Sequence, residues 1–413
     1  MSVPKLRSTA AVFTTMSALA ATSILTGPSA AEPFSTAPCA LHRTEAHHSE
    51  GVDTWNAGYP RPAGTLDAVL VFLSFPDSAP RTTPAELTAD HFPATSRFYA
   101  QSSYGRLTLR AHPLKRWLRM PRPSASYAMR RDWDAEDRAT YLRDAFAVAD
   151  REVDFSRYQV VYLIADPDAP GVDSDATKVV NLDAPLRADG TDVRRVVTVF
   201  EHHPPDRLVL AHETGHVFDL PDLYHRPADG KGDWDTHVGD WDLMGSQFGL
   251  APDLLGWHKW RLGWLDPRQV VCVRGAAPAR LTLEPLSAGP GPAGAAFGLG
   301  HGVKLAVVRT GPDSALAFEA RGPAGADRAA CRQGILVYRV RGGAASGDGP
   351  VRVVDAHPDT EACWENSVYP PLADAPVFLG ESFTVPGEGV RVEAEGRTAS
   401  GAWTVTITPG VRG

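Results

Sequence analysis

The chain has 413 residues, of which 43% are hydrophobic and 22% charged, so it has ample apolar material for packed cores and lacks the composition of a disordered protein. Its formal net charge of −8, without any block of lysines and arginines, argues against a nucleic-acid-binding surface. This length suggests two folded domains, or at most three.

Residues 1–31 have the pattern of a secretory signal peptide. Lys5 and Arg7 supply a positive start, residues 10–25 form a mostly apolar run, and Ser29 and Ala31 place small residues at a cleavage site. The run is too short and too rich in serine and threonine to span a membrane comfortably, and no later apolar run is long enough to do so. We therefore expect a secreted, extracellular protein with no membrane span.

Four cysteines suit an oxidising compartment and allow three pairings. We expect Cys331 to pair with Cys363, because both lie in the C-terminal region, and Cys39 to pair with Cys272. None of them has CxxC spacing, which argues against a cysteine zinc site. An alternative for Cys39 is a thiolate that caps an active-site metal in a latent form. The even number of cysteines favours the disulfide.

Strand and helix patterns alternate up to residue 268, which predicts a mixed sheet layered against helices. The predicted strands cover residues 66–75, 106–110, 158–164, 179–182 (an edge strand) and 194–200. The predicted helices cover residues 84–101, 133–153, 204–219 and 252–261.

Beyond residue 268, short strands separated by glycine and proline turns are typical of a β-sandwich. We expect these strands at residues 279–283, 303–309, 315–320, 335–340, 351–354, 382–385, 390–394 and 402–407. The expected fold class is α+β. The expected parts are a signal peptide (1–31), an N-terminal extension or short propeptide (32–64), a catalytic domain (65–268) and a C-terminal β-sandwich (269–413).

His212 and His216 lie four residues apart in the third predicted helix. Their side chains then project from one face about one turn apart, as two imidazoles must to bind one zinc ion. Glu213 lies beside them, where it could act as a general base on water at the metal. A charged helix with two surface histidines is the alternative interpretation, because HExxH is a short pattern that arises by chance.

Catalytic zinc needs three protein ligands and one open position. In the metzincin pattern HExxHxxGxxH the third ligand lies six residues after the second histidine, which here is Asp222. There is no glutamate between Glu213 and Glu284, which nearly excludes a glutamate ligand from a later helix. Asp219 and His225 are alternative ligands whose spacing fits less well.

Two further residues bear on this pattern. The pattern has glycine at position 219, where a left-handed backbone is expected, and this chain has Asp219. Aspartate tolerates that conformation better than most residues. Met244 lies in a glycine-flanked segment downstream, which predicts a tight turn that forms a hydrophobic floor beneath the metal. An ordinary core methionine is the alternative.

These segments together resemble the immune inhibitor A family of bacterial secreted metallopeptidases. The likeness covers roughly residues 66 to 268, with weaker similarity in the strands beyond. Its motifs lie at residues 71–77, 98–105, 212–224, 241–245 and 262–265.

The resemblance implies a metzincin-like fold and endopeptidase activity, with zinc bound by His212, His216 and Asp222 and with Glu213 as the base. It also implies that the protein is made as a zymogen and that it binds calcium as well. The calcium candidates form an acidic loop that solvated carboxylates explain equally well: Asp233, Asp235, Asp240 and Asp242.

We therefore expect a monomeric zinc-dependent endopeptidase that acts on proteins or peptides. Tyr224 and His225 are candidates for stabilising the oxyanion. One alternative is a secreted zinc hydrolase of another amide, such as a cell-wall peptide. The other is a non-catalytic extracellular binding protein with a vestigial zinc site, against which the intact Glu213 weighs.

Overall fold

The computed structural model describes residues 37–228, 230–289 and 300–410. The expected signal peptide lies outside these residues. Within these ranges, contacts join the regions before and after residue 268 into one compact unit, and a domain boundary near residue 268 stays a prediction. No helix in the described ranges combines the length and the apolar character needed to cross a bilayer.

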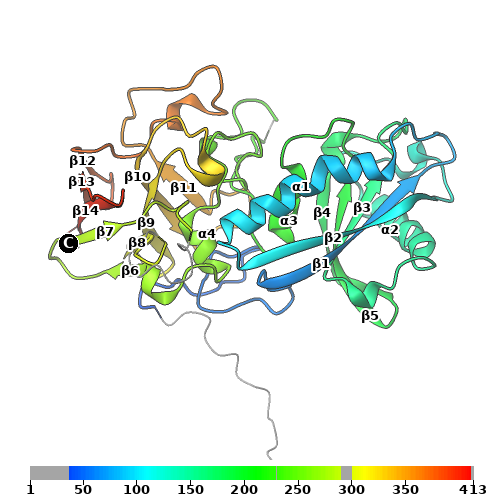
Figure 1. Cartoon of the computed structure of the whole chain (residues 1–413), viewed down its shortest axis with the longest axis horizontal. Helices are drawn as coiled ribbons and strands as arrows, with labels where there is room; N and C mark the ends of the chain where they lie inside the picture. The colour runs from blue at the N-terminus through cyan, green and yellow to red at the C-terminus, as the bar shows by residue number, and fades with distance from the viewer. Residues whose placement is uncertain (1–36, 229, 290–299, 411–413) are drawn as a thin grey trace, which may run out of the picture. The chain divides into compact units, whose positions relative to one another are not determined.

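A mixed five-stranded sheet precedes the HExxH segment (Figure 1). Its strands, in spatial order, are β2 (Leu107–Arg119), β1 (Gly64–Ser74), β3 (Val160–Ala165), β5 (Thr191–Val199) and β4 (Lys178–Ala188). The first four pair in parallel, and β4 runs antiparallel to β5 at the edge of the sheet. The expected mixed sheet and edge strand are confirmed, although β2 is longer than predicted.

Both faces of the central strands β1 and β3 are buried, and residues alternate between the two faces along each strand. In β1, Leu70 and Phe72 face the core that contains α1 (Pro84–Ser102) and α3 (Val209–Val217), whereas Val69 and Val71 face the core that contains α2 (Ala135–Ala149). Helices on both sides of the sheet therefore explain why residues 68–74 of β1 are all buried.

Helices α1 and α2 begin where a side chain accepts hydrogen bonds from the first free backbone N–H groups of the helix. Thr83 and Glu86 form a capping box at the start of α1, and the carboxylate of Asp134 caps α2. Helix α3 starts later than predicted, because Leu208 adopts a left-handed conformation with φ of +61° just before it.

Helix α4 (Gly256–Arg261) is also shorter than predicted. The backbone N–H groups of Asp253 and Leu255 donate to the carboxylates of Asp327 and Asp242, at 2.9 and 2.8 Å. These tertiary bonds hold the preceding residues in an extended path, which overrides the local helical pattern.

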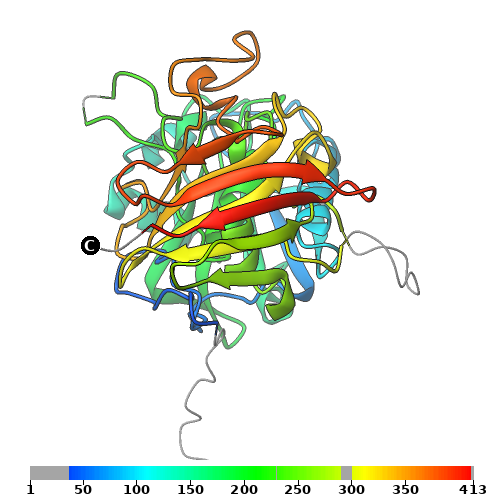
Figure 2. The ribbon, with the colours of Figure 1, turned by 90° about the vertical axis from the view of Figure 1, so that its left-hand side faces the viewer.

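Two further sheets follow residue 268. One has the order β11-β10-β9-β8-β6 and the other β12-β13-β14-β7; Figure 2 looks onto the second, with β13 and β14 in orange to red. Their bounds are β6 (Val270–Val273), β7 (Ala279–Leu283), β8 (Leu305–Arg309), β9 (Ser314–Arg321), β10 (Gly334–Arg341), β11 (Val351–Val354), β12 (Ser382–Thr384), β13 (Arg391–Arg397) and β14 (Trp403–Thr408). The two sheets share one hydrophobic core, as a sandwich requires, and β6 is the strand not predicted.

The first of these sheets has a second buried face. In β10, Ile335 and Val337 lie in the core between the two sheets, whereas Leu336 and Tyr338 lie in the core that also contains α1 and α3. The sheet therefore supports the region that carries the HExxH motif.

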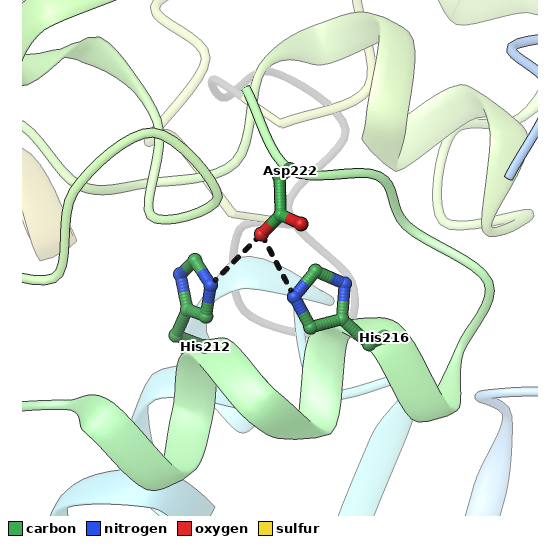
Figure 3. Close-up of side chains that lie close together, drawn as sticks. All are labelled: His212, His216 and Asp222. Carbon is green, nitrogen blue, oxygen red and sulfur yellow. Dashed lines mark ion pairs between the residues drawn. The ribbon is translucent and has the colours of Figure 1, made fainter. Parts of the chain in front are cut away.

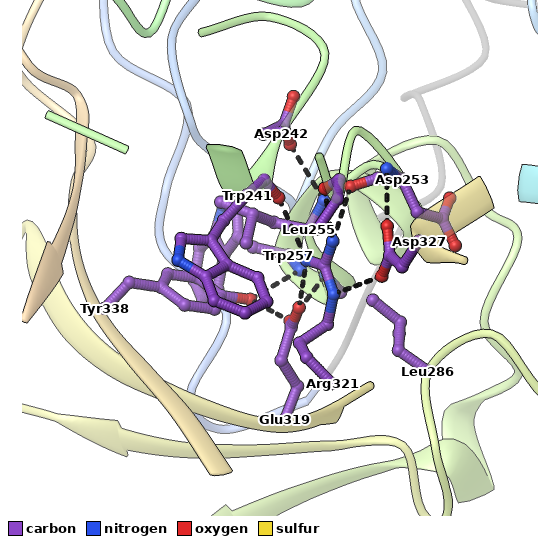
Figure 4. Close-up of polar contacts among 12 residues, drawn as sticks. Trp241, Asp242, Asp253, Leu255, Trp257, Leu286, Glu319, Arg321, Asp327 and Tyr338 are labelled. Atoms are coloured by element: carbon purple, nitrogen blue, oxygen red, sulfur yellow. Dashed lines mark hydrogen bonds and ion pairs between the residues drawn. The ribbon is translucent and has the colours of Figure 1, made fainter. Parts of the chain in front are cut away.

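A buried charge cluster links that sheet to the segment around α4 (Figure 4). The guanidinium of Arg321 binds the carboxylates of Asp327 and Glu319, at 2.7 and 3.0 Å, and donates to three backbone carbonyls. The other Glu319 oxygen accepts hydrogen bonds from Gly256 N–H and the Tyr338 hydroxyl, both at 2.6 Å. All of these side chains are buried, so their charges are compensated inside the protein.

The residues before β1 are fastened to the rest of the chain. Disulfides join Cys39 to Cys272 and Cys331 to Cys363, which confirms both expected pairings and leaves no thiolate at Cys39. In addition, the indole N–H of Trp264 donates to the carbonyl of Pro62 at 2.7 Å. Residues 37–63 are therefore attached to the rest of the fold near both ends.

Candidate metal centre

Helix α3 carries the HExxH motif, and all nine of its residues are buried. The hydroxyl of Tyr99 on α1 donates to the carbonyl of Ala211 at 2.6 Å, and the hydroxyls of Tyr162 on β3 and Thr214 lie 2.7 Å apart. The helix is thus fixed from both α1 and the sheet, which is what a precise ligand geometry requires.

The side chains of His212, His216 and Asp222 converge as predicted (Figure 3). The Oδ1 atom of Asp222 lies 3.4 Å from Nε2 of His212 and 3.1 Å from Nε2 of His216. That oxygen is buried and has no hydrogen-bond partner, because neither contact has hydrogen-bond alignment. Three possible metal-ligand atoms therefore surround one point. One of them, Oδ1 of Asp222, lacks the hydrogen-bond partner that a buried oxygen normally has.

Backbone carbonyls orient both imidazoles. Nδ1 of His212 lies 2.9 Å from the carbonyl oxygen of Leu243, and Nδ1 of His216 lies 2.8 Å from that of Leu220. A carbonyl only accepts, so Nδ1 carries the proton in both rings. In the neutral rings the Nε2 lone pairs then face Asp222, which is the usual arrangement of metal-binding histidines.

The turn at Met244 packs against α3 at Gly215. A Cβ atom at Gly215 would lie 2.4 Å from Sδ of Met244, so a larger residue at position 215 would displace the methionine side chain. The carbonyl of Met244 accepts a hydrogen bond from Leu223 N–H at 2.8 Å. The turn therefore supports both the helix and the segment that carries Asp222.

Ser346, from the loop between β10 and β11, completes the support of Asp222. Its hydroxyl oxygen accepts the Asp222 backbone N–H at 2.7 Å, and its hydroxyl donates to Oδ2 at 3.1 Å. Ser346 could not be found from the sequence, because no local pattern connects residues 124 positions apart.

Glu213 points to the edge strand, where its Oε2 accepts the backbone N–H of Val179 at 2.7 Å. Burial raises the pKa of this carboxyl group, although the two neighbouring histidines partly offset the rise. Burial alone would lower the pKa of His216, but Asp222 and Glu213 raise it to about 9. A proton and a divalent cation would therefore compete for the position between His216 and Asp222.

A cavity of about 260 Å³ opens at this group. Its lining includes Lys178, Val179, Asn181, Tyr224, Trp234 and Ser346. Tyr224 stacks near His212, with ring centroids 6.4 Å apart, whereas His225 does not line the cavity and lies against His237. Of the two oxyanion candidates, only Tyr224 borders the site.

The other candidate ligands have different partners. The carboxylate of Asp219 contacts Arg43, His48 and Arg261 instead of the two histidines of the motif. Among the described residues, His212, His216 and Asp222 form the one group of three or more that could hold a metal ion. In the acidic loop, Asp240 and Asp242 are buried and accept backbone N–H bonds, so they are not solvated carboxylates.

No protein-family model and no curated protein matches this chain. Among solved structures, the chain is similar to the crystal structure of wild-type OgpA from Akkermansia muciniphila, with 12% identity and a TM-score of 0.24. The match covers 73% of this chain and 94% of that chain. A TM-score of this size does not establish a common fold.

Proposed function

We propose that this protein is a secreted zinc-dependent endopeptidase, with zinc bound by His212, His216 and Asp222. The observation that carries the proposal is the convergence of two Nε2 atoms on a buried Asp222 oxygen that has no hydrogen-bond partner. The two disulfides support secretion, because such bonds persist in oxidising compartments.

The donor set fits zinc better than calcium or magnesium. Two imidazole nitrogens and one carboxylate suit zinc, whereas calcium and magnesium prefer oxygen ligands throughout. Three protein ligands leave one position for water or substrate, which is the arrangement of catalytic rather than structural zinc. The cavity at the group offers room for that position.

Glu213 is the proposed general base. When bound, zinc would supply a Lewis acid that polarises a peptide carbonyl and lowers the pKa of water to about 7. The carboxylate of Glu213 accepts the proton of the attacking water and delivers it to the leaving amine. Burial raises the pKa of Glu213 towards the range in which a carboxylate can both accept and release a proton.

The edge strand β4 is the proposed binding surface for the peptide. It lies at one end of the sheet, it borders the cavity through Lys178 and Val179, and it contacts Glu213 directly. An extended peptide can add to such an edge through main-chain hydrogen bonds, which places a scissile bond inside a chain next to the metal.

The arrangement also supports the metzincin-like assignment suggested by the resemblance. A mixed sheet ends in an antiparallel edge strand, α3 carries the two histidines, and the turn at Met244 lies below them. The aspartate at residue 222 takes the position of the third histidine in the pattern.

The test is hydrolysis of casein by the purified protein and by Glu213→Gln, at equal zinc content. The proposal expects cleavage inside the casein chain by the wild-type protein and a loss of about 10²- to 10⁴-fold in the variant, the usual contribution of a general base. Cell-wall material serves as the comparison substrate. Cleavage of the latter alone would replace the peptidase proposal with that of another amide hydrolase.

A further inference from the structure

Asp219 is the second residue beyond the end of α3 and follows the C-terminal cap, Phe218. The N–H of Leu220 bonds to the carbonyl of Gly215 at 3.0 Å, and the N–H of Asp219 bonds to that of His216 at 3.1 Å. This pair of bonds defines a Schellman motif, in which the residue at position 219 is left-handed and usually glycine. Asp219 has φ of +67°, so the aspartate adopts the conformation that the pattern assigns to glycine.

Three donors from distant parts of the chain surround the Asp219 carboxylate. Arg43 donates to Oδ2, Arg261 contacts Oδ2 at 2.9 Å, and Nδ1 of His48 bonds to Oδ1 at 2.8 Å. The contact from Arg261 is an ion pair without hydrogen-bond alignment. Asp219 and His48 are both buried, so the cluster is shielded from solvent.

The turn at Asp219 leads directly to two metal ligands. The next residue, Leu220, provides the carbonyl that orients His216, and Asp222 follows two residues later. The His48 ring also stacks on the ring of His216, with centroids 5.7 Å apart and an interplanar angle of 25°. A shift of the turn would therefore move an imidazole, its orienting carbonyl and the carboxylate ligand together.

The N-terminal partners of Asp219 lie on a firmly attached segment. The disulfide at Cys39 precedes them, and Glu50 follows them and binds the buried His258 at 3.0 Å. Trp257 donates its indole N–H to the Glu50 carbonyl at 3.1 Å. The segment from residue 39 to residue 50 is thus fixed at both ends, with Arg43 and His48 between the two attachments.

We propose that Asp219, held by Arg43, His48 and Arg261, is a positioning residue for His216 and Asp222, and that the segment bearing Arg43 and His48 is retained in the working enzyme. The inference rests on the proposed function, because it concerns the ligands of that metal. The carboxylate compensates for the missing conformational freedom of glycine, because it anchors the left-handed turn to two arginines and the buried His48.

The test measures zinc affinity by competition with a chromophoric chelator, and the visible spectrum of the cobalt-substituted protein. Asp219→Asn keeps a residue that tolerates the left-handed turn but removes the charge. We expect its zinc affinity to fall roughly 10- to 100-fold, as when other outer partners of metal ligands are lost, and its cobalt spectrum to change.

Two further variants separate positioning from folding. Asp219→Gly relieves the turn without restoring the anchor, so its zinc affinity should fall as well. Asp327→Asn is the matched control, because Asp327 is equally buried and also paired with an arginine, Arg321, but lies in the other charge cluster. We expect it to lower thermal stability and to leave zinc affinity and the cobalt spectrum unchanged.

Retention of the segment is tested by N-terminal sequencing of the active, zinc-loaded form. The proposal expects a start before Arg43, and an active form that starts after His48 would overturn it.

Wild-type zinc affinity in Asp219→Asn or Asp219→Gly would overturn the positioning role alone. Zinc binding without hydrolysis would overturn the peptidase proposal and leave the positioning role intact, whereas a wild-type chain that binds neither metal would overturn both.

Discussion

The backbone N–H of Val179 donates to Oε2 of Glu213 across 2.7 Å, so the edge strand and the HExxH helix meet at this carboxylate. The contact lies beside the cavity and sets how far the Glu213 side chain reaches. A general base must lie within hydrogen-bond reach of the proton it accepts, so the length of the Glu213 side chain is important.

The first prediction concerns that length. Glu213→Asp shortens the side chain by one methylene while keeping its charge, so the carboxylate moves away from both Val179 and the water. We expect kcat/KM to fall about 10²-fold, the typical cost of a displacement near 1 Å, with zinc content unchanged. Steady-state kinetics on a fluorogenic peptide measures the loss. Full activity in this variant would argue against proton transfer by Glu213.

The second prediction concerns Ser346, which supports Asp222 from the loop after β10. Ser346→Ala removes both hydrogen bonds, and we expect zinc affinity to fall at least about tenfold. Ser96→Ala is the control, because this hydroxyl is also half-buried and donates to a backbone carbonyl, that of Leu109, away from the site. If chelator competition shows equal affinities in both variants, Ser346 does not position Asp222.

The third prediction is a pH dependence of stability. His258 is buried between Glu50 and Asp242, at 3.0 and 3.1 Å. Burial alone would lower its pKa, but the two carboxylates raise the pKa to about 10, above the unfolded value near 6.5. A raised pKa means that the folded state binds the proton more tightly, so the stabilisation is complete below about pH 6.5 and is lost as pH rises towards 10.

Urea unfolding of the wild-type protein and His258→Gln at several pH values checks this prediction. The difference in their free energies of unfolding should shrink between pH 6.5 and 10. The contribution of Lys304 to the pH dependence must also be removed. Burial lowers its pKa to about 8, so its contribution to stability rises with pH, opposite in sign to that of His258. Taking the difference between the two proteins removes that contribution. A difference that is constant with pH would show that His258 does not titrate there.

The fourth prediction concerns the buried charge cluster of Figure 4. Arg321→Met leaves the carboxylates of Glu319 and Asp327 buried without their cation. We expect a loss of about 3–5 kcal/mol in the free energy of unfolding, as measured when one partner of a buried ion pair is removed. Arg280→Met, at the exposed pair with Glu395, should cost less than about 1 kcal/mol. Equal losses would contradict the role assigned to burial.

Much of the fold could be predicted because the hydrophobic pattern along the chain matches the burial of its residues in the structure. The bounds of β7 and β11 agree with the prediction, since their alternation and flanking turns are local. The starts of α3 and α4 could not be predicted. The left-handed Leu208 and the carboxylates of Asp242 and Asp327 determine them, and these are tertiary effects.

The residues of the candidate site also divide into those that the sequence predicts and those that it does not. His212, Glu213, His216 and Asp222 follow from spacing within eleven residues, so a pattern could find them. Their supports could not be found in that way. Arg43 lies 176 positions from Asp219 and Ser346 lies 124 positions from Asp222, and no periodicity links such pairs. The glycine-to-aspartate departure at residue 219 was the one local sign that an additional partner was needed.

The central claim is tested most directly by zinc content and affinity in the purified wild-type protein and in Asp222→Asn. We predict one zinc per wild-type chain. In the variant, which keeps the size of the side chain but loses its charge, we predict a loss of affinity greater than the roughly 10- to 100-fold typical of an outer partner. Equal zinc affinity in the two proteins would contradict the assignment of Asp222 as the third ligand.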